Sequence, residues 1–344
     1  MKNKLFVTLR EAEKIAKNKI SSKIFDWLQS GVEDNHTYLK NFDDLKNIKI
    51  KPSHLNKFTK LSTESNFFNN KISSPILLSP MGHQTQFHKT GEIEMARGVS
   101  KAQTVAFFGT QSRMKLSEIR KANKNALIGW TIFPFGDKQW IKNQIISAEK
   151  NKCVAIAVCI DANTRSHRYS DRESGYDARK VGKRTNPISP NPMLATSYDW
   201  SLIKFIKKNS SLPIIIKGIV TAEDAKNAIK YKADGIWISN HGGRMFNSGI
   251  SCVDSIKDVM KKLKKKKLTI IVDGGVRKGS DIIKYMCLGA DLVGVGRPAI
   301  HGLINNGHKG VEKIFEVLKK ELLASMINGG FKDFKSFKKL RLIL

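Results

Sequence analysis

The 344-residue chain carries 61 Lys and Arg residues against 30 Asp and Glu, a formal net charge of +31 at pH 7, with 40% hydrophobic residues. This hydrophobic share is enough for a sizeable core and excludes a globally disordered chain. The length suits one large barrel or two smaller domains. The basic residues are spread along the chain, and the densest run, 261–267, indicates a solvated helix end and loop. Because no zinc-finger spacing or RNA-binding aromatic signature accompanies the charge, we expect no nucleic-acid partner.

The cysteines and the N-terminus indicate the compartment. Cys153, Cys159, Cys252 and Cys287 form no CxxC pair, which predicts free thiols in a reducing compartment and no metal site. The first residues contain no signal-peptide core, and no apolar run approaches the roughly 20 residues that span a bilayer. We therefore expect a cytoplasmic protein without a transmembrane segment, and peripheral membrane contact stays open.

The first 30 residues have helical periodicity. Apolar residues recur at helical spacing from Leu9 to Leu28, and Ser30 with Gly31 ends the pattern. A polar stretch follows to about residue 70. We expect residues 1–70 to form a helical extension ahead of the main domain.

A regular alternation of short apolar runs and helical segments begins near residue 71. The runs are 75–79, 104–108, 127–132, 154–160, 213–217, 235–239, 268–272 and 291–295. They are apolar throughout, as expected when both faces of a parallel sheet are buried. Segments such as 221–232 and 279–288 between them have helical periodicity.

Eight alternating β and α units predict a TIM (β/α)8 barrel over 71–300, within a single domain that spans 1–344. A doubly wound sheet is the structural alternative. The long segment 161–200 between the fourth and fifth runs is typical of an active-site lid. Residues 301–344 are expected to be helical and to end in a basic tail.

Polar, charged and glycine residues follow most of the predicted strands. In a TIM barrel the active site lies at these carboxyl ends. The sequences there are SPMG from residue 79, Asp161 after the fourth strand, Lys217 at the end of the fifth, SNHGGR from 239, DGGVR from 273 and GVGRP from 294. Packing alone does not explain such residues at one strand end after another.

The motifs after strands seven and eight fit a phosphate group. Phosphate sites in this fold commonly lie in these two loops. Glycines let backbone N–H groups approach an anion, and Arg277 and Arg297 can neutralise it. By themselves DGGVR and GRP indicate a phosphate-bearing ligand, and ordinary tight turns remain an alternative.

SNHGGR is the sharper motif. Histidine is the usual general base near neutral pH, so His241 is the candidate base. Arg244, three residues on, can hold a carboxylate through its planar fork. A lone histidine is more often structural, but its position between Ser-Asn and Gly-Gly-Arg at a strand end favours catalysis.

Taken together, SNHGGR, DGGVR, GRP and the lysine of IIIKG resemble the FMN-dependent α-hydroxy acid dehydrogenase family, which includes glycolate oxidase, lactate oxidase and mandelate dehydrogenase. The resemblance covers nearly the whole chain and extends to SGVEDNHTYLKNF from residue 30. It implies FMN as cofactor, a small-molecule substrate, an electron acceptor that the sequence does not identify, and a homotetramer.

The resemblance also implies roles for individual residues. His241 matches the base that takes the substrate proton, and Asp161 matches the carboxylate that steadies it. Arg168 and Arg244 match the pair that holds the substrate carboxylate, and Lys217 matches the lysine that stabilises reduced flavin. Cofactor contacts are implied for Pro80, Met81, Gly82, Gly109, Thr131, Cys159, Lys217, Ser239, Asp273, Gly274, Gly275, Arg277, Gly296 and Arg297. The sequence does not distinguish hydride transfer from a carbanion route.

Several substrate-facing positions depart from the family. Trp27 stands where the family has a tyrosine that binds the substrate carboxylate, and Phe133 stands where it has a second tyrosine. Cys159 replaces a flavin-contacting threonine. Each lost hydroxyl removes a hydrogen bond worth about 1–3 kcal/mol, so we expect a non-standard substrate. Oxidation of an amine or a modified peptide, or a basic anion-binding protein with weakened catalysis, are the alternative functions.

Overall fold

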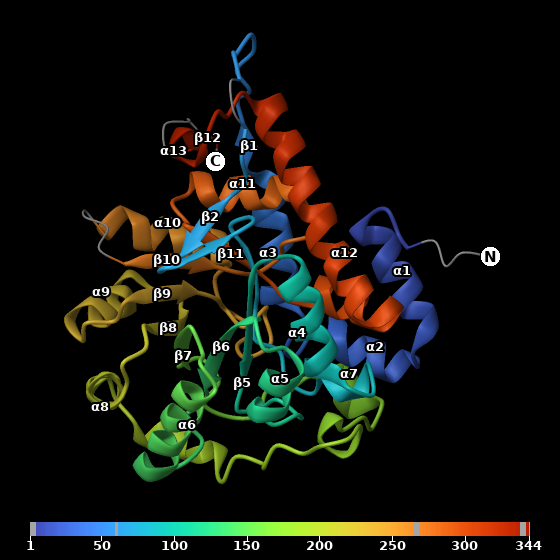
Figure 1. Cartoon of the computed structure of the whole chain (residues 1–344). Helices are drawn as coiled ribbons and strands as arrows, with labels where there is room; N and C mark the ends of the chain where they lie inside the picture. Colours follow the sequence, from blue (N-terminus) through green and yellow to red (C-terminus); the bar gives the residue numbers. More distant parts are fainter. Residues whose placement is uncertain (1–4, 59–60, 264–267, 338–341, 344) are drawn as a thin grey trace.

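The computed structural model describes residues 5–58, 61–263, 268–337 and 342–343. Eight parallel strands close into a barrel in the order β10-β11-β4-β5-β6-β7-β8-β9, seen at the centre of Figure 1. The TIM-barrel prediction is confirmed. The strands are β4 (Ile76–Leu78), β5 (Val105–Gly109), β6 (Leu127–Ile132), β7 (Ala155–Cys159), β8 (Ile214–Ile219), β9 (Gly235–Ile238), β10 (Thr269–Val272) and β11 (Leu292–Val295).

The barrel strands are buried on both faces, which is why their sequences are apolar throughout. One set of alternate residues, including Leu77, Phe107 and Trp237, packs inside the barrel. The other set packs against the helices outside. These helices are α4 (Gly91–Lys101), α5 (Leu116–Ala122), α6 (Lys138–Lys150), α8 (Ser201–Asn209), α9 (Ala222–Lys230), α10 (Cys252–Lys262), α11 (Gly279–Cys287) and α12 (Arg297–Gly329).

A hairpin of β2 (Ser65–Phe67) and β3 (Asn70–Ile72) contributes to the interior at the amino-terminal end of the barrel. The Phe67 ring lies 5.8 Å from that of Phe107, which in turn lies 5.1 Å from that of Trp237. This column of edge-to-face aromatic rings fills the barrel and leaves the opposite end for a ligand.

The N-terminal extension comprises two helices in place of one continuous run, α1 (Leu9–Lys19) and α2 (Ser22–Gln29), followed by α3 (His36–Asn47). Figure 1 shows α12 lying beside α1 and α4. The chain ends differently from the all-helical expectation. After α13 (Phe334–Phe337), the strand β12 (Leu342–Ile343) pairs antiparallel with β1 (Lys49–Ile50). Residues 264–267 of the lysine run, and 338–341 and 344 of the basic tail, lie outside the described residues.

The segment 161–200 contains α7 (Tyr169–Glu173) and the short 3-10 helices η2 (Ala178–Lys180) and η3 (Pro192–Ser197). Arg113, which follows β5, anchors it to the barrel. The Arg113 guanidinium donates to the carbonyls of Ala178 and Gly182, and its own carbonyl accepts from the amides of Thr185 and Asn186 at 2.8 Å each. The lid is thus bound to the barrel over the middle of its length.

Within the described part of the chain, no helix has the length and apolarity that a membrane-crossing helix requires.

Gly129 on β6 is expected to be essential for packing the barrel interior. A Cβ built at this position would lie 2.3 Å from the ring of Phe107. Gly129→Ala should therefore lower the free energy of unfolding by about 1–3 kcal/mol through overpacking, measured by urea denaturation. Gly249→Ala is the matched control, because its Cβ would meet nothing closer than 3.5 Å. Equal stability of the two variants would contradict this packing.

Candidate active site

A pocket of about 300 Å³ opens at the carboxyl ends of the barrel strands. Its wall is built from residues that follow β4, β5, β6, β9, β10 and β11, from Lys217 on β8, from the lid, and from the end of α2. Because parallel strands place their carboxyl ends at one rim, motifs far apart in the sequence meet here.

The structure brings most of the proposed cofactor residues to this wall. Those on it are Pro80, Met81, Gly82, Gly109, Lys217, Ser239, Asp273, Gly274, Gly275, Arg277, Gly296 and Arg297. Thr131 and Cys159 are not part of the wall; both are buried in the strands behind it. The Thr131 hydroxyl oxygen has no hydrogen-bond partner, whereas the Cys159 thiol donates to Asp161 Oδ1 at 3.0 Å.

One end of the pocket has the chemistry of a phosphate site. The Arg277 guanidinium lies 5.0 Å from the Phe42 ring, and that of Arg297 lies 4.6 Å from the Tyr38 ring. Among the described residues neither guanidinium has a carboxylate within ion-pair distance. Burial lowers the pKa of Arg297 to about 10. A buried arginine bonded only to carbonyls lacks a counter-ion, and a phosphate would supply it.

The glycines beside these arginines allow a close approach of the backbone. Gly274 and Gly275 have φ of +104° and +75°, and a Cβ on Gly275 would lie 2.7 Å from the Asn41 carbonyl oxygen. Gly296 precedes the first turn of α12, where free N–H groups favour an anion. The residues present therefore fit the phosphate of FMN.

Lys217 places a fixed positive charge on the pocket wall. Its side chain is buried, and Nζ donates to Ser239 Oγ at 3.1 Å. Burial alone would lower the pKa of Lys217, but the carboxylates of Asp161 and Asp273 outweigh burial and raise it. Asp273 is held in turn by donors from Ser79 Oγ at 3.1 Å and Trp237 Nε1 at 3.0 Å. A buried ammonium of this kind suits a group that gains negative charge on reduction.

His241 and Asp161 form a pair next to Lys217. His241 Nδ1 lies 3.1 Å from Asp161 Oδ1. Burial would raise the pKa of Asp161, yet His241 and Lys217 outweigh it and hold that pKa well below its usual range. Because Nδ1 faces the carboxylate, Nε2 is the nitrogen left for a ligand in the pocket. The His241 backbone is left-handed, with φ of +56°, in the tight turn of SNHGGR.

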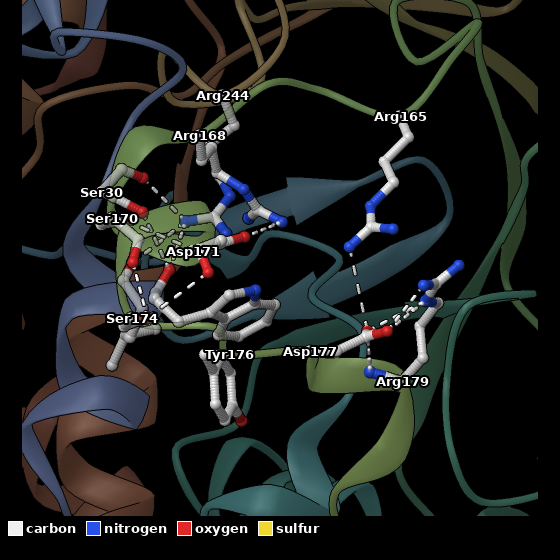
Figure 2. A network of polar contacts seen from close by, with 12 residues as sticks. Ser30, Arg165, Arg168, Ser170, Asp171, Ser174, Tyr176, Asp177, Arg179 and Arg244 are labelled. Atoms are coloured by element: carbon white, nitrogen blue, oxygen red, sulfur yellow. Dashed lines mark hydrogen bonds and ion pairs between the residues drawn. The ribbon is translucent and has the colours of Figure 1, made fainter.

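The two proposed carboxylate-binding arginines lie over the same indole ring. The guanidinium carbons of Arg168 and Arg244 are 5.4 and 4.9 Å from the Trp27 ring, and Figure 2 shows the two guanidinium groups side by side. Arg244 Nη1 donates to the carbonyls at the end of α2, and Arg168 pairs with Asp171 at 2.8 Å. Arg168 Nε is buried, and no described residue of the chain forms a hydrogen bond with it. Trp27 therefore acts as a platform that positions both arginines.

Sequence reasoning missed several residues of the wall, including His83, Phe135 and Met245. His83 had a usable signal, because it comes three residues after Pro80 in a loop already assigned to the site. The others depend on how the lid folds back over the barrel. Phe133 lies on the wall as proposed, with its ring 6.1 Å from that of His241.

A TIM barrel whose mouth combines a phosphate site, a buried lysine and a histidine–carboxylate pair has the architecture of a flavin-dependent oxidoreductase. The chain belongs to the FMN-dependent dehydrogenase family, whose model matches residues 16–343. It is thus an FMN-dependent oxidoreductase of the hydroxy acid oxidase type.

Known relatives resemble the chain over almost its whole length. Glycolate oxidase 3 of Arabidopsis thaliana is 30% identical over 343 residues, covering 94% of this chain and 92% of the relative. Human 2-hydroxyacid oxidase 1 is 27% identical over 349 residues, covering 96% and 94%. A crystal structure of mandelate oxidase with 3,3-difluoro-2-hydroxy-3-phenylpropionic acid superposes with a TM-score of 0.92 at 26% identity, covering 98% of this chain and 99% of that one.

Arg277 is expected to discriminate FMN from riboflavin. Replacing it in Arg277→Gln removes a charge-assisted hydrogen bond to phosphate, worth about 1.5–3 kcal/mol, or roughly 10–100-fold in FMN affinity. Riboflavin, which lacks the phosphate, should bind both forms alike. Flavin fluorescence quenching in titrations of the apoprotein measures both affinities. Equal losses for the two flavins would show that Arg277 does not bind the phosphate.

Proposed function

We propose that this enzyme oxidises a 2-hydroxy acid to the 2-oxo acid, with His241 as the base. The observation that carries the proposal is the His241–Asp161 pair, which shares one pocket with Lys217 and with the stacked guanidiniums of Arg168 and Arg244. A planar carboxylate matches the fork of a guanidinium group, and this wall carries two, so an acid fits it better than an amine does.

Each group has a distinct task in this reaction. Arg168 and Arg244 bind the substrate carboxylate and so orient carbon 2 in the pocket. His241 Nε2 accepts a proton from the substrate, and Asp161 stabilises the imidazolium that forms. When bound, FMN supplies the acceptor for the two electrons that leave carbon 2. Lys217 contributes a positive charge that would stabilise the negative charge of the reduced flavin.

The substrate-facing positions support a non-standard acid. Trp27 and Phe133 present ring surface where hydroxyl donors are expected from the resemblance, and Phe135 and Met245 extend this apolar surface. Trp27 is committed to stacking with the two arginines. A substrate with a longer side chain gains burial against these groups, worth roughly 25 cal/mol per Å².

We also propose that the chain forms one domain, with 1–70 and 301–344 packed against a barrel over 71–300 and 161–200 as its lid. One hydrophobic core that includes Phe6, the barrel helices and Phe337 supports this. The four free cysteines support a reducing, cytoplasmic setting, and the family resemblance supports a homotetramer. The electron acceptor is a separate question for kinetics.

His241 is expected to control flavin reduction and not flavin binding. His241→Asn keeps a residue that tolerates the left-handed backbone and removes the base. Substrate-dependent bleaching of the flavin should slow by about 10²–10⁴-fold while FMN content stays unchanged. Anaerobic stopped-flow absorbance measures the rate. Bleaching at the wild-type rate would contradict the assignment of the base.

Glycolate and L-lactate are expected to be poor substrates, and a larger 2-hydroxy acid to be preferred. A small acid depends on polar contacts that Trp27 and Phe133 do not supply, and misorientation lowers the rate even where binding survives. Steady-state kcat/KM for glycolate, L-lactate, 2-hydroxyoctanoate and mandelate compares them directly. A value for glycolate at or above the others would overturn this interpretation of the pocket.

A further inference from the structure

The pocket wall carries more positive charge than the cofactor and a single substrate carboxylate require. Among the described residues Asp273 is the only acidic side chain on the wall, whereas its fixed cations are Arg165, Arg168, Lys217, Arg244, Arg277 and Arg297. In the proposed function Arg277 and Arg297 bind the phosphate, and Lys217 stabilises the reduced flavin. Arg168 and Arg244 bind the substrate carboxylate. Arg165 remains without an assigned anion.

Arg165 has only a weak partner within the protein. Its side chain is 61% exposed, and its guanidinium lies 4.0 Å from Asp177 Oδ1. Arg179 already binds that carboxylate, with Nε 2.9 Å from Oδ1 and Nη2 2.6 Å from Oδ2. Figure 2 shows Asp177 between the two arginines. The charge of Arg165 is therefore available to a ligand that enters the pocket.

The surroundings of Arg165 are cationic as well. Arg113 and Arg184 lie close enough to His83 to act on it, since burial and these charges lower the pKa of His83 to about 3. Of the lid carboxylates, Asp171 is bound by Arg168 and Asp177 by Arg179. The potential at the lid end of the pocket is thus positive and favours a second negative group.

His83 adds a neutral donor to this end. Arg113 Nε donates to His83 Nδ1 at 3.2 Å, which places the ring proton on Nε2. His83 lies on the pocket wall, and its ring is 5.9 Å from that of Trp27. A carboxylate can therefore find both a guanidinium and a fixed N–H donor on this side of the pocket.

We propose that the substrate is a 2-hydroxy acid whose side chain ends in a second carboxylate, and that Arg165 is the specificity-determining residue that binds it. This rests on the proposed function, in which Arg168 and Arg244 hold the first carboxylate. The carbon chain between the two acids packs against Phe133 and Met245 on the same wall. A dicarboxylate supplies Arg165 with an anion other than the shared and distant carboxylate of Asp177.

The test compares 2-hydroxyglutarate with its distal monoamide, which has the same shape but no second charge. Anaerobic flavin bleaching gives a half-saturation concentration for each compound. The wild-type holoenzyme should half-saturate with the dicarboxylate at an about tenfold lower concentration, as expected for a charge-assisted contact on a partly exposed arginine. The preference should shrink as ionic strength rises.

Three lid variants separate Arg165 from the general charge of the lid. Arg165→Gln should raise half-saturation for the dicarboxylate about tenfold and leave the monoamide unchanged. Arg172→Gln removes the same charge from an exposed lid residue outside the wall, and should leave the preference intact. Asp177→Asn removes the acid that competes for Arg165, and should strengthen the preference.

Binding of 2-oxoglutarate and of its distal monoamide, followed by the flavin absorbance spectrum, repeats the comparison without turnover, and the dicarboxylate should again bind about tenfold more tightly. Equal values for acid and amide, or equal losses in Arg165→Gln and Arg172→Gln, would overturn the inference while the proposed function stands. If no 2-hydroxy acid of any kind bleached the flavin, the proposed function itself would fail, and the inference with it.

Discussion

The electrostatic attraction between the buried Lys217 ammonium and the carboxylates of Asp161 and Asp273 is the interaction on which the site depends. An ammonium enclosed by the barrel is costly unless carboxylates compensate it, and these two carboxylates come from the ends of β7 and β10. Asp161 in turn sets the orientation of His241, which follows β9. Strands β7, β8, β9 and β10 must therefore be in register before these four side chains come together. Assembly of the site thus depends on closure of the barrel.

Much of this arrangement was predictable because it depends on local sequence. The barrel strands begin and end within one or two residues of the apolar runs, since burial on both faces leaves an uninterrupted signal. The residues after most strands, and Lys217 on β8, reach the pocket because the fold places all carboxyl ends together. The short side chains of Thr131 and Cys159 were assigned to the cofactor by resemblance, whereas the structure keeps both behind the wall.

Other features follow from long-range packing and leave no sequence signature. Trp27 stands where the family has a carboxylate-binding tyrosine, and its ring supports Arg168 from the lid and Arg244 from the loop after β9. That role exists only because α2 packs across the barrel mouth. Likewise, the end of the N-terminal helical pattern gives no indication that the carbonyls there bind Arg244 and Arg297. His83 has a left-handed backbone conformation. Its ring accepts a hydrogen bond from Arg113, which is 30 residues away in the sequence.

The lid converts these long-range contacts into a fixed spacing between two anion sites. Arg113 binds the lid at the first residue of η2, through Ala178, and beyond η2, through Gly182, Thr185 and Asn186. Near the start of the segment, the backbone of Glu33, from the extension, forms a parallel β-bridge with that of Arg168, and the Glu33 amide donates to the His167 carbonyl at 2.8 Å. Arg165 and Arg168 are only three residues apart, so the backbone between them sets how far one carboxylate lies from the next. A lid held near its start and over its middle favours substrates of matching length over longer or shorter ones, because the arginines cannot separate to follow the substrate without breaking these contacts.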